Sequence, residues 1–358
     1  MKIPIKLGFR SYPVQLDTGL RFRFPDLTEP FHRNQKWVLV TQRSLATLAH
    51  TVILDRFIHA GYNMSIVFVG DGETAKSLSQ MEALYDRLVQ LNCDRSTILV
   101  SFGGGVVGDI TGFAAATFLR GVRYIQIPTT LLAMVDSAIG GKTGINLRQG
   151  KNLVGSIYQP VMVLIDPELL ESLSLRDRVS GLGEVIKYGA IRDAEFLEWL
   201  DRNLFALIHE NHWNLYLETI ERSVRIKGDL VSRDELETDL RRLLNFGHTI
   251  GHALETSAGY GSLRHGEAVA LGMLAAGEIS VNKGLLPFKC WVRLKDIIRQ
   301  CPLPEVPEIV KADFLSVIKK DKKMSGGNVH MVLLKDLGEP VIESGISDDE
   351  LLQGLAVL

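Results

Sequence analysis

Short β-rich apolar runs recur along the first half of the chain, and segments with helical character lie between them. The runs are residues 36–41, 64–69, 97–102, 124–127 and 162–165. Such runs are typical of strands buried on both faces, and their alternation with helices predicts a mostly parallel sheet covered by helices. The hairpin-like opening segment predicts antiparallel strands at one edge of that sheet.

After about Pro167 the apolar residues follow a 3.6-residue period, which predicts helices at 194–208, 213–230, 240–255 and 267–282. A chain of 358 residues is long for one domain. We therefore expect an α/β domain at 1–166 and a mainly helical domain at 167–358. The strand-like tail at 329–342 is compatible with either domain.

Composition excludes several functional classes. The 40 basic and 42 acidic residues give a net charge of −2, so no overall field attracts nucleic acid or an anionic membrane. Cys93, Cys290 and Cys301 form no CxxC pair, which favours a reducing compartment over a disulfide framework. The sequence has no signal-peptide pattern and no apolar stretch of the ~18 residues that a membrane span needs. We expect a cytoplasmic protein without nucleic-acid or membrane partners.

A glycine-rich loop directly follows the run at 97–102. Residues 103–109 satisfy the GxGxxG pattern and lead into a helix-like segment, as in loops that bind a pyrophosphate with backbone N–H groups. The acidic residue expected ~20 positions later for a ribose hydroxyl is absent, so a simple tight turn is the alternative. A second loop, Gly70 to Glu73 with Lys76, also follows a strand at the end where open α/β sheets bind ligands.

Histidines and one glutamate indicate a metal site. His248 and His252 are four residues apart and so share one helical face. Thr249 stands where a zinc protease would have its glutamate, so protease chemistry is not supported. With His265 and Glu184, whose apolar context requires a compensating partner, the chain offers the two-histidine, one-carboxylate composition of catalytic zinc sites. A capping or core role for each residue is the alternative.

Several cations lie beside polar loops: Lys142, Lys151, Lys187, Lys227, Arg241 and the cluster at 320–323. Solvated surface charge is the alternative for most of them. Lys142 follows two glycines at the end of an apolar stretch and resembles part of an anion-binding turn. A substrate with both a phosphate and a carboxylate would explain the number of cations.

Together these segments resemble the 3-dehydroquinate synthases of the shikimate pathway, which are sugar phosphate cyclases. The matching segments are FGGGVVGDITGFAAATFLRG, QIPTTLLAMVDSAIGGKTGIN, GKNLVGSIYQP, GLGEVIKYG, LLNFGHTIGHALE, RHGEAVALGM and DKKMSGG. They occur in the family's order and cover most of the chain from about residue 98. The resemblance implies a Rossmann-like N-terminal domain that binds NAD, a helical C-terminal domain that binds zinc or cobalt, a cleft between them, and a homodimer.

The resemblance also implies roles for individual residues. The metal ligands would be Glu184, His248 and His265. The substrate phosphate would bind Lys142, Asn152, Asn245, His252 and Lys322 of the DKK cluster. The substrate carboxylate would bind Lys227 and Arg241, and the hydroxyls near the metal Asp136 and Lys187. Arg120 would reach the phosphate site of a neighbouring subunit. NAD would bind Glu73, Lys76, Gly104, Gly105, Asp109, Thr129, Thr130, Lys142 and Lys151.

The chain departs from the family pattern near the expected nucleotide site. Gln42 and Arg43 stand where the family commonly has an aspartate, which leaves NADP open as an alternative cofactor. Asp239 replaces a usual glycine and His330 a common arginine, at positions on which the chemistry does not depend.

The implied reaction converts 3-deoxy-D-arabino-heptulosonate 7-phosphate into 3-dehydroquinate and phosphate. NAD would transiently oxidise one hydroxyl, phosphate would leave, NADH would return its hydride, and an intramolecular aldol step would close the ring, which makes the enzyme a lyase. The alternatives are another cyclase, such as 2-deoxy-scyllo-inosose synthase, a metal-dependent polyol dehydrogenase, and a non-catalytic NAD-binding protein. Lys227 and Arg241 argue against the other cyclase, because glucose 6-phosphate has no carboxylate.

Overall fold

The computed structural model describes residues 1–29, 31–257, 259, 262–306, 314–319 and 329–358, and it divides into two compact units. Unit 1 consists of residues 1–173 and 216–236, and unit 2 of residues 174–215 and 237–358. The units are therefore not continuous stretches of chain, because most of helix α8 (Trp213–Arg233) belongs to unit 1. The expected boundary between residues 166 and 167 stays a prediction about folding domains.

Unit 1 is built on a sheet whose seven strands, among the described residues, run in the order β1-β2-β9-β6-β5-β3-β4. In chain order they are β1 (Lys2–Ile5), β2 (Tyr12–Leu16), β3 (Lys36–Gln42), β4 (Asn63–Val69), β5 (Ile98–Gly103), β6 (Arg123–Pro128) and β9 (Met162–Ile165). The β1–β2 pair at one edge is antiparallel, whereas β2–β9, β9–β6, β6–β5, β5–β3 and β3–β4 are parallel. The predicted mostly parallel sheet with an antiparallel edge is confirmed.

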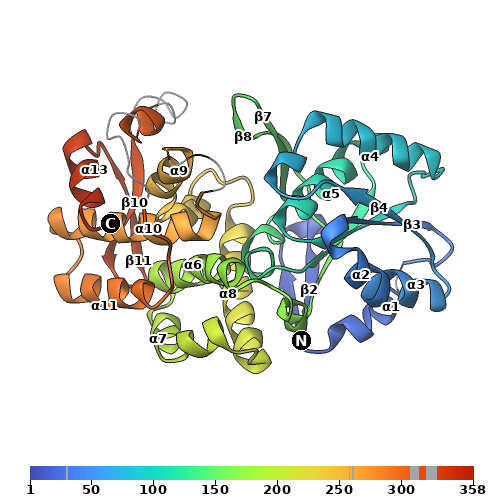
Figure 1. Ribbon diagram of the computed structural model, residues 1–358, viewed down its shortest axis with the longest axis horizontal. Helices are drawn as coiled ribbons and strands as arrows, with labels where there is room; N and C mark the ends of the chain where they lie inside the picture. Colours follow the sequence, from blue (N-terminus) through green and yellow to red (C-terminus); the bar gives the residue numbers. More distant parts are fainter. Residues whose placement is uncertain (30, 258, 260–261, 307–313, 320–328) are drawn as a thin grey trace. The chain divides into compact units, whose positions relative to one another are not determined.

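Helices cover both faces of this sheet (Figure 1). On one face α4 (Leu78–Gln90) and α5 (Gly105–Thr117) share an apolar core with Val38, Val67 and Leu99. On the other face Trp37 of β3 packs edge-on against Tyr62 and next to Phe57 of α3 (Asp55–His59). Because both faces are covered, every residue of β5 is buried, as its apolar sequence requires. The short helices α1 (Phe24–Leu27) and α2 (Ala46–Ala49) complete this part of unit 1.

A hairpin in unit 1 was not predicted. The strands β7 (Lys142–Leu147) and β8 (Gly150–Ile157) pair in antiparallel orientation. Their close approach depends on glycine, because a Cβ at Gly155 would lie 2.1 Å from the carbonyl oxygen of Thr143. The expected turn at 140–141 does form, with positive φ angles of 98° and 67°, and Lys142 then opens the strand.

Unit 2 is mainly helical, as predicted. Its helices are α6 (Leu175–Arg192), α7 (Ala194–His209), α9 (His248–Ser257), α10 (His265–Asn282), α11 (Phe288–Arg299) and α13 (Asp348–Leu355). The apolar helix α10 lies at the centre and packs against α6, α9, α11 and α13 (Figure 1). The strand-like tail forms the hairpin β10 (His330–Asp336) and β11 (Glu339–Ser344) in this unit.

The prediction of one continuous helix over 240–255 is wrong. A 3₁₀ helix spans Leu240–Asn245 and is capped by Phe246, and α9 begins only at His248. Gly247 interrupts the helix with a φ of +80°, and a Cβ there would lie 2.6 Å from the carbonyl oxygen of Val269. The break therefore lets the chain turn tightly against α10 immediately before a histidine.

In the part of the chain that the structure describes, no helix has both the length and the apolar character required to cross a membrane.

Candidate functional site

Three helices of unit 2 bring Glu184, His248 and His265 together. Glu184 lies within α6 and is completely buried, whereas His248 and His265 are the first residues of α9 and α10. Oε1 of Glu184 lies 3.4 Å from Nε2 of His248 and 3.3 Å from Nε2 of His265. The carboxylate thus faces both imidazole rings with the same oxygen.

Glycines explain how the helices come so close. A Cβ at Gly266 would lie 1.7 Å from the carbonyl oxygen of Ser180, and one at Gly183 would lie 2.2 Å from the carbonyl oxygen of Gly266. No side chain therefore separates α6 from α10 at this point. A Cβ at Gly272 would similarly lie 1.9 Å from the carbonyl oxygen of Gly247, so α10 also approaches the turn before α9. Three of these glycines directly neighbour the three candidate ligands in the sequence.

The charges around Glu184 compensate its burial. Burial opposes its ionisation, but Lys187 and then His248 hold the pKa of the Glu184 carboxyl well below its usual range. Burial, followed by the charge of Lys187, lowers the pKa of His248. Burial would also lower the pKa of His265, yet the nearby carboxylates of Glu184 and Glu255 raise it to about 10.

The donor set fits a divalent metal ion. Lys187 forms an ion pair with Oε2 of Glu184, yet neither carboxylate oxygen has a well-directed hydrogen bond. Buried carboxylates without such bonds are costly, so a ligand should satisfy them. Ligand atoms about 2.1 Å from a tetrahedral zinc ion lie about 3.4 Å from one another. The two oxygen–nitrogen distances at Glu184 have this length.

A second ligand set is geometrically possible. Ligand atoms of His248, His252 and His265 all lie within 4.8 Å of one another. The ring centroid of His252 is 5.4 Å from that of His248 and 5.7 Å from that of His265. His252 is exposed, however, whereas Glu184 is buried next to the rings of His248 and His265. The burial of an ionised carboxylate favours the set with Glu184.

Other predicted site residues of unit 2 are distributed around the helix break. Arg241 is 2% exposed within the 3₁₀ helix, and Asn245 at its end donates a hydrogen bond to Glu237 at 3.3 Å. The helix predicted over 240–255 would have placed Arg241, Asn245 and His248 on one face, but the 3₁₀ helix ends before His248. Lys322 lies outside the described residues.

In unit 1 the glycine loop connects β5 to α5, as predicted. Gly104 precedes the helix without a side-chain cap, so the first N–H groups of α5 are not covered by a capping side chain. A Cβ at Gly104 would lie 3.2 Å from Thr130, and one at Gly105 would lie 3.0 Å from Oγ of Ser137. The N–H of Thr129 donates to the carbonyl oxygen of Gly103 at 3.0 Å, which ties the next strand end to this loop.

An ion pair joins the second loop to the first. Nζ of Lys76 lies 2.6 Å from Oδ2 of Asp109 and 3.6 Å from Oε1 of Glu73, and it also contacts Oδ1 of Asn152. Burial raises the pKa of Asp109 to about 6, although Lys76 acts in the opposite direction. Asn152 adopts a φ of +55° in β8, a left-handed conformation that asparagine tolerates. Lys76 therefore links residues expected at the NAD site and the phosphate site.

Asp136 and Lys227 form a second ion pair in unit 1. Asp136 lies in a π-helical turn, Ala133–Ser137, and Lys227 lies on α8 with 5% exposure. Nζ of Lys227 is 2.5 Å from Oδ1 and 2.7 Å from the carbonyl oxygen of Asp136. The family resemblance implies that these two residues bind different groups of the substrate, and the structure places them in direct contact.

The remaining predicted residues of unit 1 lie nearer the surface. Lys142 is exposed, and Lys151 is half-buried on β8. Arg120 is exposed with a φ of +67°, between Leu119 at +51° and Gly121 at +124°. Three successive residues in this region of φ form an unusual turn shortly after the end of α5.

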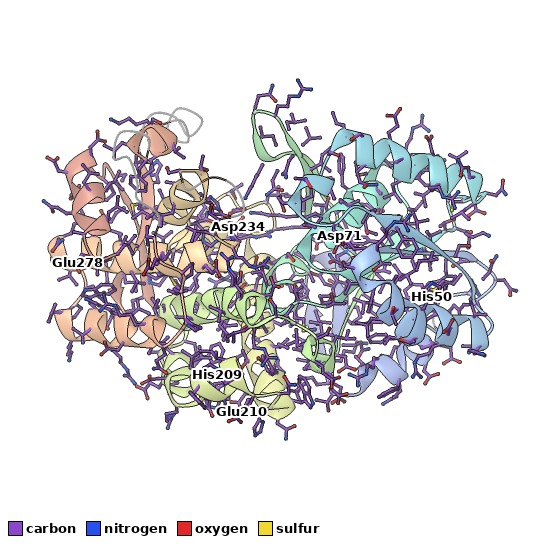
Figure 2. All side chains as sticks on the ribbon, viewed as in Figure 1. His50, Asp71, His209, Glu210, Asp234 and Glu278 are labelled. Atoms are coloured by element: carbon purple, nitrogen blue, oxygen red, sulfur yellow. The ribbon has the colours of Figure 1, made fainter. Side chains whose placement is uncertain are left out.

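The end of β3 carries no carboxylate, as its sequence indicates. Nε2 of Gln42 donates to the carbonyl oxygen of Gly70 at 3.1 Å, and the guanidinium of Arg43 lies 5.4 Å from the ring centroid of Phe68. Asp71 (labelled in Figure 2) belongs to the loop at 70–73 but was assigned no role from the sequence, and it accepts a hydrogen bond from Ser44 at 2.5 Å. A hollow of about 350 Å³ beside this loop is lined in part by Asp71. The acidic residue after the strand at 64–69 was the available signal.

Comparisons with known proteins show the family of this chain. Residues 66–180 match the family model described as 3-dehydroquinate synthase N-terminal, and residues 181–324 match the one described as 3-dehydroquinate synthase C-terminal. The chain is 40% identical to a 3-dehydroquinate synthase of Prochlorococcus marinus (strain MIT 9312), over 97% of each chain.

Solved structures show the same fold. One is a 2-epi-5-epi-valiolone synthase of Streptomyces hygroscopicus subsp. jinggangensis with NAD⁺ and Zn²⁺ bound, at 27% identity, a TM-score of 0.89 and 96% coverage of both chains. Another is a 2-deoxy-scyllo-inosose synthase in complex with carbaglucose-6-phosphate, NAD⁺ and Co²⁺, at 25% identity and a TM-score of 0.87, covering 99% of this chain and 98% of the other.

Proposed function

Because this chain belongs to the 3-dehydroquinate synthase family, we propose that it converts 3-deoxy-D-arabino-heptulosonate 7-phosphate into 3-dehydroquinate and inorganic phosphate. The observation that supports this most directly is the convergence of Glu184, His248 and His265 in unit 2. This donor set suits a metal ion that polarises a substrate oxygen.

The cofactors of the reaction are NAD and one divalent metal ion, zinc or cobalt, as in the two solved cyclases. When bound, NAD supplies reversible hydride transfer and the metal ion supplies a Lewis acid. Glu184, His248 and His265 would hold the metal ion, and Lys187 would keep Glu184 ionised through their ion pair. His252 would remain available for the substrate.

We assign the nucleotide to the glycine loop of unit 1. Because α5 begins at Gly105 without a side-chain cap, its first N–H groups could donate to a pyrophosphate. Lys76 and Asp109 would fix the neighbouring loop through their ion pair at 2.6 Å. The full proposed set of NAD ligands is Glu73, Lys76, Gly104, Gly105, Asp109, Thr129, Thr130, Lys142 and Lys151.

We assign the phosphate, the carboxylate and the hydroxyls of the substrate to three groups of residues. Lys142, Asn152, Asn245, His252 and Lys322 would bind the phosphate. Lys227 and Arg241 would bind the carboxylate, and Asp136 and Lys187 the hydroxyls. By fixing both anionic ends these groups hold the reacting atoms in one geometry, an effect that contributes ~7–11 kcal/mol in well-oriented reactions.

We also propose the reaction class, the oligomeric state and the cellular compartment of the enzyme. The enzyme would be a carbon–oxygen lyase, because phosphate leaves from carbon and the redox steps cancel. It would work as a homodimer in which Arg120 reaches the phosphate of the neighbouring copy. It would act in the cytoplasm, where its cysteines stay reduced.

The test is a coupled assay for phosphate release from 3-deoxy-D-arabino-heptulosonate 7-phosphate, with NAD at less than one equivalent of substrate. We expect complete conversion without accumulation of NADH. Accumulation of NADH in step with product would contradict the cyclase reaction and support a polyol dehydrogenase. The same assay with glucose 6-phosphate separates the two cyclase functions, since turnover comparable to that of the acidic sugar would favour 2-deoxy-scyllo-inosose synthesis.

A further inference from the structure

The two histidines at the metal site are held in the same way. Nε2 of each ring faces Oε1 of Glu184, at 3.4 Å for His248 and 3.3 Å for His265. Nδ1 of each ring faces an acceptor on the other side. Nδ1 of His248 lies 3.2 Å from the carbonyl oxygen of Phe246, and Nδ1 of His265 lies 3.6 Å from Oε2 of Glu255.

Helix geometry brings Glu255 to this position. Glu255 follows His248 by seven residues, about two turns of α9, so both side chains lie on one face of the helix. This face is pressed against α10, because a Cβ at Gly251 would lie 2.8 Å from the carbonyl oxygen of Ala268. Glu255 is 8% exposed, and its carboxylate therefore meets His265 in a largely buried environment.

We propose that Glu255 is a positioning residue for the metal site. Its carboxylate faces Nδ1 of His265 at 3.6 Å, and its negative charge favours the tautomer with the proton on Nδ1. That tautomer has its lone pair on Nε2, the atom that faces Glu184. Histidines that bind metals generally have their second ring nitrogen held by a carboxylate or a carbonyl oxygen, and loss of that partner typically lowers metal affinity 10- to 100-fold. The inference rests on the proposed function, because that function makes His265 a metal ligand.

A glutamine at position 255 keeps the size of the side chain but removes the charge. Its amide NH₂ can also face Nδ1, which favours the tautomer with the proton on Nε2, and this tautomer has no lone pair on Nε2 for a metal ion. Glu255→Gln should therefore weaken metal binding, and Glu255→Asp should restore part of the affinity because it restores the charge.

The experiment is a competition titration of the metal-free full-length chain with Zn²⁺ and a chromophoric chelator. Glu278→Gln is the matched control, since Glu278 (labelled in Figure 2) also lies on α10 and accepts a hydrogen bond from Trp291 at 2.9 Å. It follows His265 by thirteen residues, which is about 20 Å along the helix. We expect Glu255→Gln to lower the affinity for Zn²⁺ at least 10-fold and Glu278→Gln to leave it unchanged.

Two further readouts separate positioning from a loss of folding. The visible absorption of bound Co²⁺ should change in Glu255→Gln at saturating metal and stay unchanged in Glu278→Gln. Thermal unfolding of the metal-free variants should be similar. An affinity of Glu255→Gln within about threefold of wild type, with an unchanged Co²⁺ spectrum, would overturn the inference. A wild-type chain that binds no metal ion would instead overturn the proposed function.

Discussion

Gly266→Ala tests whether close helix packing builds the metal site. Local propensity predicts that alanine within α10 should stabilise the helix by up to ~1 kcal/mol. The packing predicts the opposite, because the new Cβ would lie 1.7 Å from the carbonyl oxygen of Ser180, and 2.6 Å and 3.0 Å from its carbonyl carbon and Cα. All three atoms belong to the backbone of α6, so no side chain can rotate away.

The size of the perturbation follows from these distances. Ordinary contact begins at 3.4 Å, so α6 and α10 must separate locally by about 1.7 Å. Metal–ligand distances tolerate deviations of about 0.2 Å, and Glu184 and His265 lie on the two helices that separate. We expect a loss of ~3 kcal/mol or more in the free energy of unfolding, at the upper end for overpacked sites, together with a loss of tight metal binding.

The assay is a zinc competition titration combined with chemical unfolding of the metal-free chain. Gly277→Ala is the control, because its Cβ would lie 2.6 Å from the ring of Trp291, about 18 Å along α10 from His265. The control should lose stability and keep metal affinity. If Gly266→Ala unfolds at the wild-type denaturant concentration and binds zinc normally, the glycine contact does not determine the site.

Three other predictions follow from the ion pairs and cations. Lys76→Met should lower the free energy of unfolding by ~3 kcal/mol above pH 6 and by less near pH 5, as measured by chemical unfolding across this range. The reason is that the pKa of Asp109 rises from 3.8 to about 6 on folding, so at low pH this carboxyl is uncharged in the folded chain and needs no partner. An equal loss at both pH values would contradict this reasoning. Arg241→Leu should lower kcat/KM for the acidic sugar phosphate by ~10²–10³, the equivalent of ~3–4 kcal/mol, with unchanged metal content, and unaltered kinetics would remove Arg241 from the substrate site. Mixed dimers of Arg120→Ala and Lys142→Ala chains should recover activity that neither variant has alone, and no recovery in proven heterodimers would assign Arg120 to its own subunit.

Local sequence patterns predicted much of the fold. The run at 97–102 is buried on both faces because helices cover both sides of the sheet, and its apolar residues already indicated this. The glycines at 103–108 also predicted the strand-to-helix turn, since this conformation is a property of the local chain. The prediction of one helix over 240–255 was wrong because the apolar period continues across Phe246 and Gly247. The break is instead determined by the close approach of α10 to Gly247, which the local sequence does not show.

The candidate site was only partly predictable for a similar reason. Residue types indicated a metal site among Glu184, His248, His252 and His265, because a carboxylate in an apolar context needs a partner. The family resemblance then implied the set Glu184, His248 and His265. Contacts between distant segments have no local signature, so the pairing of Asp136 with Lys227 could not be anticipated from their separation of 91 residues. Glu255 was missed because a glutamate on an amphipathic helix usually lies in solvent.

The assignment of α8 to unit 1 affects how this protein could be divided or inherited. Ser232 of α8 accepts a hydrogen bond from the N–H of Lys6 at 3.1 Å, and Glu235, two residues after the helix, pairs with Arg10 at 2.6 Å. These contacts connect the segment to the first residues of unit 1. A fragment that ends at residue 173 would lack this helix and would leave Asp136 without Lys227. The chain passes from one unit to the other three times, at 173/174, 215/216 and 236/237. Each unit therefore consists of two separate stretches of chain, and a single crossover or gene fusion cannot move either unit intact. The coding sequences of the two units have to be inherited and engineered together.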